Sequence, residues 1–362
     1  AAIADGGVTN DTTPTFAGIV EAGATLTVSV DGKAPVNVPL TSDSSSWTYT
    51  PPSLSDGPHS FSFVATDAAG NVSGPTDFTL IVDTVVLPPV ISSVTDDFSP
   101  VMGAIVNGGF TNDATPTFTG TVEAGATLTV SIDNATPVTV QVSGTAWSYT
   151  SGTLSNGTHT FAFVATDAAG NVSAATPFSL TVDTVAPAVP VIVSVIDNVP
   201  NGTNAIANAG VTNDTTPTFS GTASQGVTLA VSIDGDEPLA VVVSNGSWTF
   251  VPPAALANGT HTFSFVATDG AGNESAPATF SLEVDTDAPA APVITSVTDN
   301  VPSGTAPIAN GGVTNDPTPT FTGTVEAGAT LTVSVNGGMA VAVTVTGSGW
   351  SFTPSAPLPN GT

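Results

Sequence analysis

Cysteine is absent from this chain, and Lys33 is the one Lys or Arg among its 362 residues. Without cysteine, neither disulfides nor thiolate metal sites can hold the fold together. Because 29 acidic residues stand against that lysine, the formal net charge is -28, which argues against binding nucleic acid or an anionic membrane through charge. The same surplus of carboxylates favours a divalent cation as a partner.

Long apolar runs are also missing. No run reaches the length of about 18 residues that a membrane span needs, so we expect no membrane insertion in this segment. No stretch shows helical periodicity with caps, so we expect almost no helix. Hydrophobic residues still make up 40% of the chain, with a mean hydropathy of +0.31, which excludes wholesale disorder despite the charge.

The residues that are present form one unit copied about every hundred positions. The phrase Ala-Thr-Asp-x-x-Gly-Asn occurs at residues 65–71, 165–171 and 267–273, and a tryptophan recurs at positions 47, 147, 248 and 350. A unit of this length can bury its own core, unlike a short solenoid repeat. We expect four modules, over residues 1–84, 85–184, 185–286 and 287–362. The sequence predicts that the first lacks its first strand and the last its final two strands.

Polar and apolar residues alternate within each copy, which is typical of half-buried antiparallel strands. Turns rich in Gly, Asn, Asp and Pro separate them. The second copy has seven predicted strands, at 90–96, 116–122, 127–133, 137–142, 146–150, 160–166 and 177–182. This pattern predicts an all-β chain of tandem immunoglobulin-like sandwiches stacked end to end. We interpret Trp47 and its equivalents as core residues rather than carbohydrate-stacking ones, because they keep one register with the strand alternation.

The order of motifs resembles the bacterial Ig-like tandem repeats of giant calcium-dependent surface adhesins of the RTX and biofilm-associated type. The resemblance rests on Thr-Asn-Asp-x-x-Pro-Thr-Phe-x-Gly, Glu-Ala-Gly-Ala-Thr-Leu-Thr-Val, Asn-Gly-Thr-His-Thr-Phe, Ala-Thr-Asp-Ala-Ala-Gly-Asn and Val-Asp-Thr-x-x-Pro. It covers essentially the entire chain. It implies an extender that holds a ligand-binding tip away from a bacterial cell, calcium between modules, an extracellular or cell-surface location and one-step (type I) secretion.

Calcium is also indicated by the residues alone, because 13 of the 29 acidic residues fall in four recurring positions. Strand direction places three of these positions at one end of a sandwich and the Asp-x-x-Gly-Asn loop at the other. Stacked modules would therefore bring several carboxylates together with no Lys or Arg nearby, and Ca²⁺ takes six to eight oxygens. Mg²⁺ is a poorer candidate because it prefers a strict octahedron.

The expected calcium ligands can be given for each junction, the place where two successive modules meet. The first gathers Asp11, Asp83, Asp167 and Asn171; the second gathers Asp96, Asp97, Asp113, Asp183, Asp269 and Asn273; the third carries Asp197, Asp214, Asp285 and Asp287. Asp67 and Asn71 would face a preceding module, and Asp299 and Asp316 a following one. The alternative is that these are turn residues that bond their own backbone. The chain has no EF-hand loop to decide the matter.

Catalysis is not expected. The three histidines, His59, His159 and His261, lie a module length apart and cannot converge on one substrate. Two function classes stay open. The first is an extender, stiffened by short proline-bearing linkers, whose partners are neighbouring repeats and other copies in a fibre. The second is a binding module that contacts carbohydrate, protein or other fibres through exposed edges and loops, of which the loop from Asp96 to Asn112 varies most between copies.

Overall fold

A computed structural model describes residues 2–40, 45–100, 102–199, 205–302 and 306–361. All regular secondary structure in these ranges is β-strand, and no helix occurs in them. The prediction of an all-β chain of tandem immunoglobulin-like domains is confirmed. Residues 101, 200–204 and 303–305, which belong to the variable loop and its counterparts, lie outside the described ranges.

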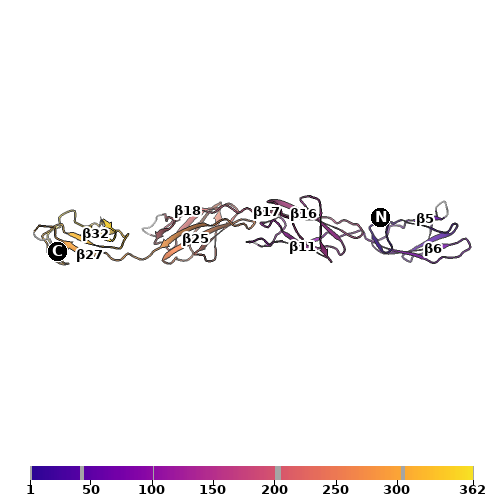
Figure 1. Cartoon of the computed structure of the whole chain (residues 1–362), viewed down its shortest axis with the longest axis horizontal. Coiled ribbons are helices and arrows are strands. Elements are labelled where there is room, and N and C mark those ends of the chain that lie inside the picture. Colours follow the sequence, from indigo (N-terminus) through magenta and orange to yellow (C-terminus); the bar gives the residue numbers. More distant parts are fainter. Residues whose placement is uncertain (1, 41–44, 101, 200–204, 303–305, 362) are drawn as a thin grey trace. The chain divides into compact units, whose positions relative to one another are not determined.

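The strands fall into four repeats, named here by their strands (Figure 1). The first repeat contains β1 (Gly7–Thr9), β2 (Phe16–Ile19), β3 (Thr25–Val30), β4 (Val36–Val38), β5 (Ser46–Tyr49), β6 (Gly57–Thr66) and β7 (Thr76–Val82). The second contains β8 (Val90–Asp96), β9 (Gly103–Ala104), β10 (Gly109–Thr111), β11 (Thr117–Thr121), β12 (Thr127–Ile132), β13 (Val138–Val140), β14 (Val142–Ser143), β15 (Ala146–Thr150), β16 (Gly157–Thr166) and β17 (Thr176–Val182). The third contains β18 (Val191–Ile196), β19 (Gly210–Thr212), β20 (Thr218–Thr222), β21 (Thr228–Ile233), β22 (Leu239–Val241), β23 (Val243–Ser244), β24 (Ser247–Phe250), β25 (Gly259–Thr268) and β26 (Ala278–Val284). The fourth contains β27 (Val293–Thr298), β28 (Thr320–Thr324), β29 (Leu331–Val333), β30 (Val341–Val343), β31 (Val345–Thr346) and β32 (Gly349–Phe352).

The second repeat is a sandwich of two five-stranded sheets. One sheet has the order β10, β17, β16, β12, β13, and the other has the order β14, β15, β11, β8, β9. Phe118 from one sheet lies against Phe161 from the other, with ring centroids 4.4 Å apart, and Trp147 stacks on Phe163 at 4.9 Å. These side chains are buried, which confirms the interpretation of Trp147 as a core residue. Burial of this aromatic cluster between two alternating sheets holds the repeat together.

The structure has ten strands in this repeat where the sequence predicts seven. The extra strands β9 and β10 come from the segment before Asn112, which shows no alternation long enough to indicate a strand. β10 pairs in parallel with β17, with Thr111 opposite Val182. The predicted strand 137–142 divides into β13 and β14, which belong to different sheets, because the chain crosses from one sheet to the other at this edge.

The chain as a whole divides into two compact units. The first comprises residues 1–196, 217–252 and 261–281, and the second comprises 197–216, 253–260 and 282–362. Within the first unit, the first repeat forms one sheet in the order β1, β7, β6, β3, β4 and a two-stranded sheet of β2 and β5. The same unit holds the sheet β18, β20, β24, β23 of the third repeat, and the second unit holds the sheet β27, β28, β32, β31 of the fourth.

Each histidine forms a pair with an aspartate that the sequence did not reveal. His59 Nδ1 lies 2.8 Å from Asp31 Oδ2, and His59 Nε2 lies 2.7 Å from the carbonyl oxygen of Ser55. His159 repeats this arrangement with Asp133 and Ser155, and His261 pairs with Asp234. A carboxylate and a carbonyl both only accept hydrogen bonds, so the doubly protonated ring satisfies both contacts.

The pKa values of these groups follow from the same geometry. Burial alone would lower the pKa of His59 and of His159, but the hydrogen bonds to the serine carbonyl and to the aspartate outweigh it, and both pKa values lie above 6.5. Burial alone would raise the pKa of Asp31, but bonds from the Ser60 amide and from His59 outweigh it and lower that pKa. The His59–Asp31 and His159–Asp133 pairs are therefore ion pairs at mildly acidic pH.

Stability is expected to fall as pH rises above neutrality. Because the pKa values of His59 and His159 are raised on folding, the stabilisation is complete below about pH 6.5 and is lost as pH rises through the folded-state pKa. The aspartates are partly exposed, so we expect a loss of about 0.5 kcal/mol per repeat. Urea unfolding at about pH 5.5 and about pH 8.5 measures it. The variant with His59, His159 and His261 all replaced by Gln should lose this pH dependence; if it keeps the full dependence, the histidine pairs are not its source.

Candidate metal site

The Asp-x-x-Gly-Asn phrase folds into a compact loop after the longest strand of a repeat. In the second repeat, Asp167 Oδ1 accepts the amide of Asn171 at 2.8 Å, and Asp167 Oδ2 accepts the Asn171 side-chain amide at 2.7 Å. Gly170 has a φ of 92°, a left-handed conformation that glycine adopts without strain. Asp67 with Asn71, and Asp269 with Asn273, form the same bonds. These residues therefore form turns by bonding their own backbone, as the alternative interpretation of the sequence expects.

The loop also contacts the residue that follows the last strand of the preceding repeat. Asn171 Nδ2 donates to the main-chain carbonyl of Asp83 at 2.8 Å, and Asn273 Nδ2 donates to that of Asp183 at 2.8 Å. A further bond runs from Thr176 Oγ1 to the carbonyl of Pro89 at 2.5 Å. The structure thus brings Asp83 together with Asp167 and Asn171, and Asp183 together with Asn273, as strand direction predicts.

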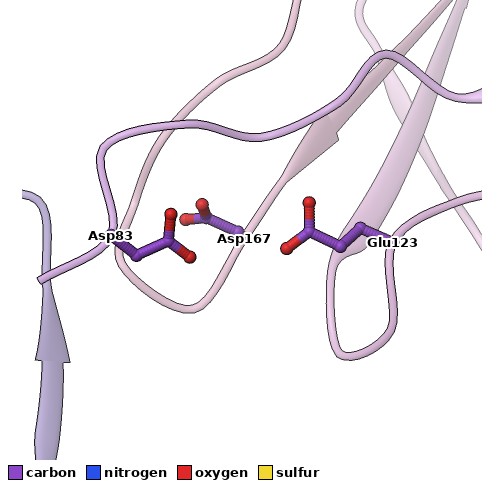
Figure 2. A group of neighbouring side chains, drawn as sticks. All are labelled: Asp83, Glu123 and Asp167. Atoms are coloured by element: carbon purple, nitrogen blue, oxygen red, sulfur yellow. The ribbon is translucent and has the colours of Figure 1, made fainter. Parts of the chain in front are cut away.

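Three carboxylates converge at the first of these contacts (Figure 2). Asp83 follows β7, Asp167 follows β16, and Glu123 lies in the turn between β11 and β12; each offers an oxygen within 4.8 Å of the others. All three are half-buried. Within the described ranges this is the one group of three or more Asp, Glu, His or Cys side chains so close together. The larger set expected at the second junction, Asp96, Asp97, Asp113, Asp183 and Asp269, does not form such a group.

The electrostatics of the group are those of an anion cluster. Burial alone would raise the pKa of Asp167, but the hydrogen bonds from the Asn171 side chain and amide outweigh it, and this pKa lies below its ordinary value. Asp167 is therefore ionised at neutral pH. Glu123 is held near the linker between β7 and β8, residues 83–89, since its Oε2 lies 3.5 Å from the amide nitrogen of Leu87. An all-oxygen set of this charge suits Ca²⁺, with further oxygens supplied by water.

Glu123 is the member that sequence reasoning missed. Its Glu-Ala-Gly context has the composition of a turn, which does not by itself indicate a metal ligand. A signal was present, since Glu21, Glu123 and Glu326 occupy the same place in three repeats, whereas the third repeat has Ser224 there. In the fourth repeat Glu326 Oε2 accepts the amide of Ala290 at 2.9 Å, so the glutamate again lies beside the linker.

Asp11 lies outside the carboxylate group, contrary to the expected set for the first junction. Its Oδ1 accepts the amide of Thr13 at 2.9 Å, which makes it a turn residue two positions before that threonine. Asp97 is exposed to solvent. For Asp11, the bond within its own turn holds the side chain away from the group.

Asp96 and Asp113 form a buried network inside their own repeat. Thr111 Oγ1 donates to Asp96 Oδ2 at 2.6 Å and accepts the Asp113 amide at 3.0 Å, while the amide of Asp183 donates to the Thr111 carbonyl at 2.9 Å. Asp197 and Asp214 repeat this network around Thr212, and Asp299 and Asp316 repeat it around Thr314. Asp285, at the third junction, accepts the amide of Asp287.

The second repeat leaves two buried oxygens of this network unsatisfied. Asn112 Oδ1 and Asp113 Oδ2 have no hydrogen-bond partner among the described residues, and both residues are buried. In the third and fourth repeats the matching aspartate oxygen accepts the amide of Asn198 or Asn300 at 2.7 Å. A buried acceptor without a partner is costly, and a water molecule or a cation would satisfy it.

The described part of the chain contains no helix with the length and hydropathy to cross a membrane.

No curated protein matches the sequence. Among solved structures, one from a study titled "Structural insight into host cell surface retention of a 1.5-MDa bacterial ice-binding adhesin" is 22% identical with a TM-score of 0.35, and the alignment covers 75% of this chain and 91% of that one. The FN1–FN3 domains of chicken CNTN1 are 15% identical with a TM-score of 0.33, over 76% of this chain and 91% of that chain. Fibronectin(III)-like modules of Clostridium thermocellum CbhA are 19% identical with a TM-score of 0.29, over 53% and 94%.

A family model described as "Bacterial Ig-like domain" matches almost the whole chain. The matched residues are 2–84, 92–184, 190–286 and 290–362. Each match contains the strands of one repeat or most of them. The chain therefore belongs to the bacterial Ig-like domain family and consists of tandem copies of that domain.

Proposed function

We propose that this chain is an extender segment of a large bacterial surface adhesin or biofilm matrix protein, stiffened by calcium at the junctions of its repeats. The observation that carries the proposal is the carboxylate group of Asp83, Glu123 and Asp167, which joins residues of two successive repeats. A cation bound there would tie the end of one repeat to a loop of the next. Family membership and the tandem arrangement support the extender role.

A cation would stabilise the contact between repeats because the three carboxylates of the group repel one another. Two carboxylates 4.8 Å apart repel by about 1 kcal/mol in water and by about 3–4 kcal/mol at an effective dielectric constant of 20. Lys33 is the only Lys or Arg in the chain, and no ion pair among the described residues joins it to Asp83, Glu123 or Asp167. Ca²⁺ binds carboxylates and carbonyls in flexible geometry and would convert the repulsion into attraction. The two unsatisfied oxygens of Asn112 and Asp113 offer a second place for an ion, at the next junction.

The proposed function is structural rather than enzymatic. Each histidine is engaged with an aspartate of its own repeat, which favours a structural role for it. We place the protein outside the cell or on its surface, exported by one-step (type I) secretion, on the strength of the resemblance to calcium-dependent adhesins. Its partners would be neighbouring repeats and other copies in a fibre.

One observation favours the alternative, a repeated binding module. Phe98, Met102, Val106 and Phe110 of the second repeat are each more than half exposed. The third repeat has the smaller Val199, Ala207 and Val211 at three of these positions. Large exposed apolar side chains that differ between copies are what a selective contact site would use.

Removing calcium should make the chain more flexible. With calcium bound, the junctions are held by cation and hydrogen bonds together; without it, carboxylate repulsion opposes the hydrogen bonds. Small-angle scattering with added calcium and then with a chelator measures the change. We expect the largest dimension to be well defined with calcium and to become broadly distributed in the chelator, and an unchanged distribution would contradict the proposal.

Calcium affinity at the first junction should depend on Glu123. Replacing Glu123 with Gln removes one of three charged ligands, and we expect the site to bind calcium about tenfold more weakly, which corresponds to about 1.4 kcal/mol. Titration calorimetry measures the affinity. Glu237→Gln is the matched control, because it makes the same change of charge at an exposed turn of the third repeat. Equal weakening by both variants would show that net charge, not a site, attracts the ion.

A further inference from the structure

The last strand of a repeat is held by an earlier strand of the same repeat that runs in the same direction. In the second repeat β10 pairs in parallel with β17, with Gly109 opposite Leu180 and Thr111 opposite Val182. β1 pairs with β7, and β19 with β26, in the same parallel arrangement. Because the pairing recurs in successive copies, it is a property of the repeated unit.

Hydrogen bonds extend this contact beyond the paired residues at both ends. At the N-terminal end, the Gly108 amide donates to the Ser179 carbonyl at 2.8 Å, and the Ser179 amide donates to Asn107 Oδ1 at 2.8 Å. At the C-terminal end, the Asp183 amide donates to the Thr111 carbonyl at 2.9 Å. The first repeat contains the equivalent bonds at both ends, and the third contains the equivalent of the Asp183 bond.

The interior of this contact is shielded from water. Thr111 and Leu180 are 0% exposed, and Val182 is 1% exposed. A hydrogen bond is stronger in such surroundings than in water, and a buried group that loses its partner without gaining water is costly. The contact therefore resists the loss of single bonds.

The order of the strands along the chain determines how tension would load this contact. Tension along the chain reaches β10 from its N-terminal side and β17 from its C-terminal side, since β10 precedes β17 and the next repeat follows β17. In a parallel pair these points lie at opposite ends, so the strands are pulled past each other and their evenly spaced bonds bear the load together. In an antiparallel hairpin they lie at the same end, and the bonds break one after another.

The strands that precede β10 do not bypass this contact. β8 and β9 belong to the other sheet of the second repeat, so their detachment would not separate β10 from β17. The next repeat is joined at the same place, because the Asp183 amide bonds to Thr111 and the Asp183 carbonyl accepts Asn273 Nδ2 at 2.8 Å. Tension from the next repeat would therefore arrive directly at the end of the β10–β17 contact.

We propose that the repeats have a further, load-bearing function, and that the parallel pair of β10 and β17 is the mechanical clamp of the second repeat. The clamp resists force along the chain and is weak against force that peels the two strands apart from one end. The source of the tension rests on the proposed extender role, whereas the clamp lies within one repeat and does not require calcium.

Pulling the second repeat in two directions tests the proposal. The chain has no cysteine, so introduced cysteines are unique attachment points for single-molecule force spectroscopy on the whole chain. Val106→Cys with Val185→Cys loads opposite ends of the clamp, and Val106→Cys with Ala174→Cys loads the same end; all three positions are exposed. At equal force and with a chelator present, we expect the first variant to unfold at least about tenfold more slowly than the second.

Urea unfolding of both variants is the control, because equal stability leaves the direction of force as the difference between them. If a variant is less stable, the third repeat provides the same comparison on β19 and β26, with Ala207→Cys and Asp287→Cys against Ala207→Cys and Ala276→Cys. Equal unfolding rates in the two directions overturn the clamp. A chain whose dimensions do not respond to calcium contradicts the calcium stiffening alone, so the two proposals fail separately.

Discussion

The contact between repeats depends on a bond that lies wholly within one of them. Both carboxylate oxygens of Asp167 accept hydrogen bonds from Asn171, which fixes the loop and the direction of the asparagine side chain. Only then does Asn171 Nδ2 reach the Asp83 carbonyl, and only then does Asp167 lie beside Asp83 and Glu123. Turn chemistry and cation chemistry are thus not alternatives, since the turn positions the carboxylate that a cation would bind.

The features that depend on periodicity can be predicted from the sequence. The spacing of the tryptophans and the alternation of residues predicted the repeats, the two-sheet architecture and the burial of Trp147. Strand direction also predicts that Asp83 lies near Asn171, as the hydrogen bond between them shows. These inferences succeed because the side-chain period of a strand and its direction are fixed by backbone geometry alone.

The structural features that the sequence does not predict depend on short strands or on contacts between residues far apart in the chain. β10 is three residues long and pairs in parallel with β17, and neither property leaves a pattern in the sequence. Glu123 belongs to the carboxylate group only because its turn lies beside residues from distant parts of the chain. Asp11 lies outside the group because its side chain bonds within its own turn. The aspartate partners of the histidines lie 26 to 28 residues away, beyond any local pattern.

The acceptor of the asparagine bond at each junction is a main-chain carbonyl, at Asp83 in one case and Asp183 in the other. Every residue type carries that carbonyl, so the bond makes no demand on the side chain of the preceding copy. A duplicated copy inserted anywhere in the array would form the bond with whatever neighbour it acquired. Gene duplication can therefore lengthen such a protein in one step, with no compensating substitution at the new boundary.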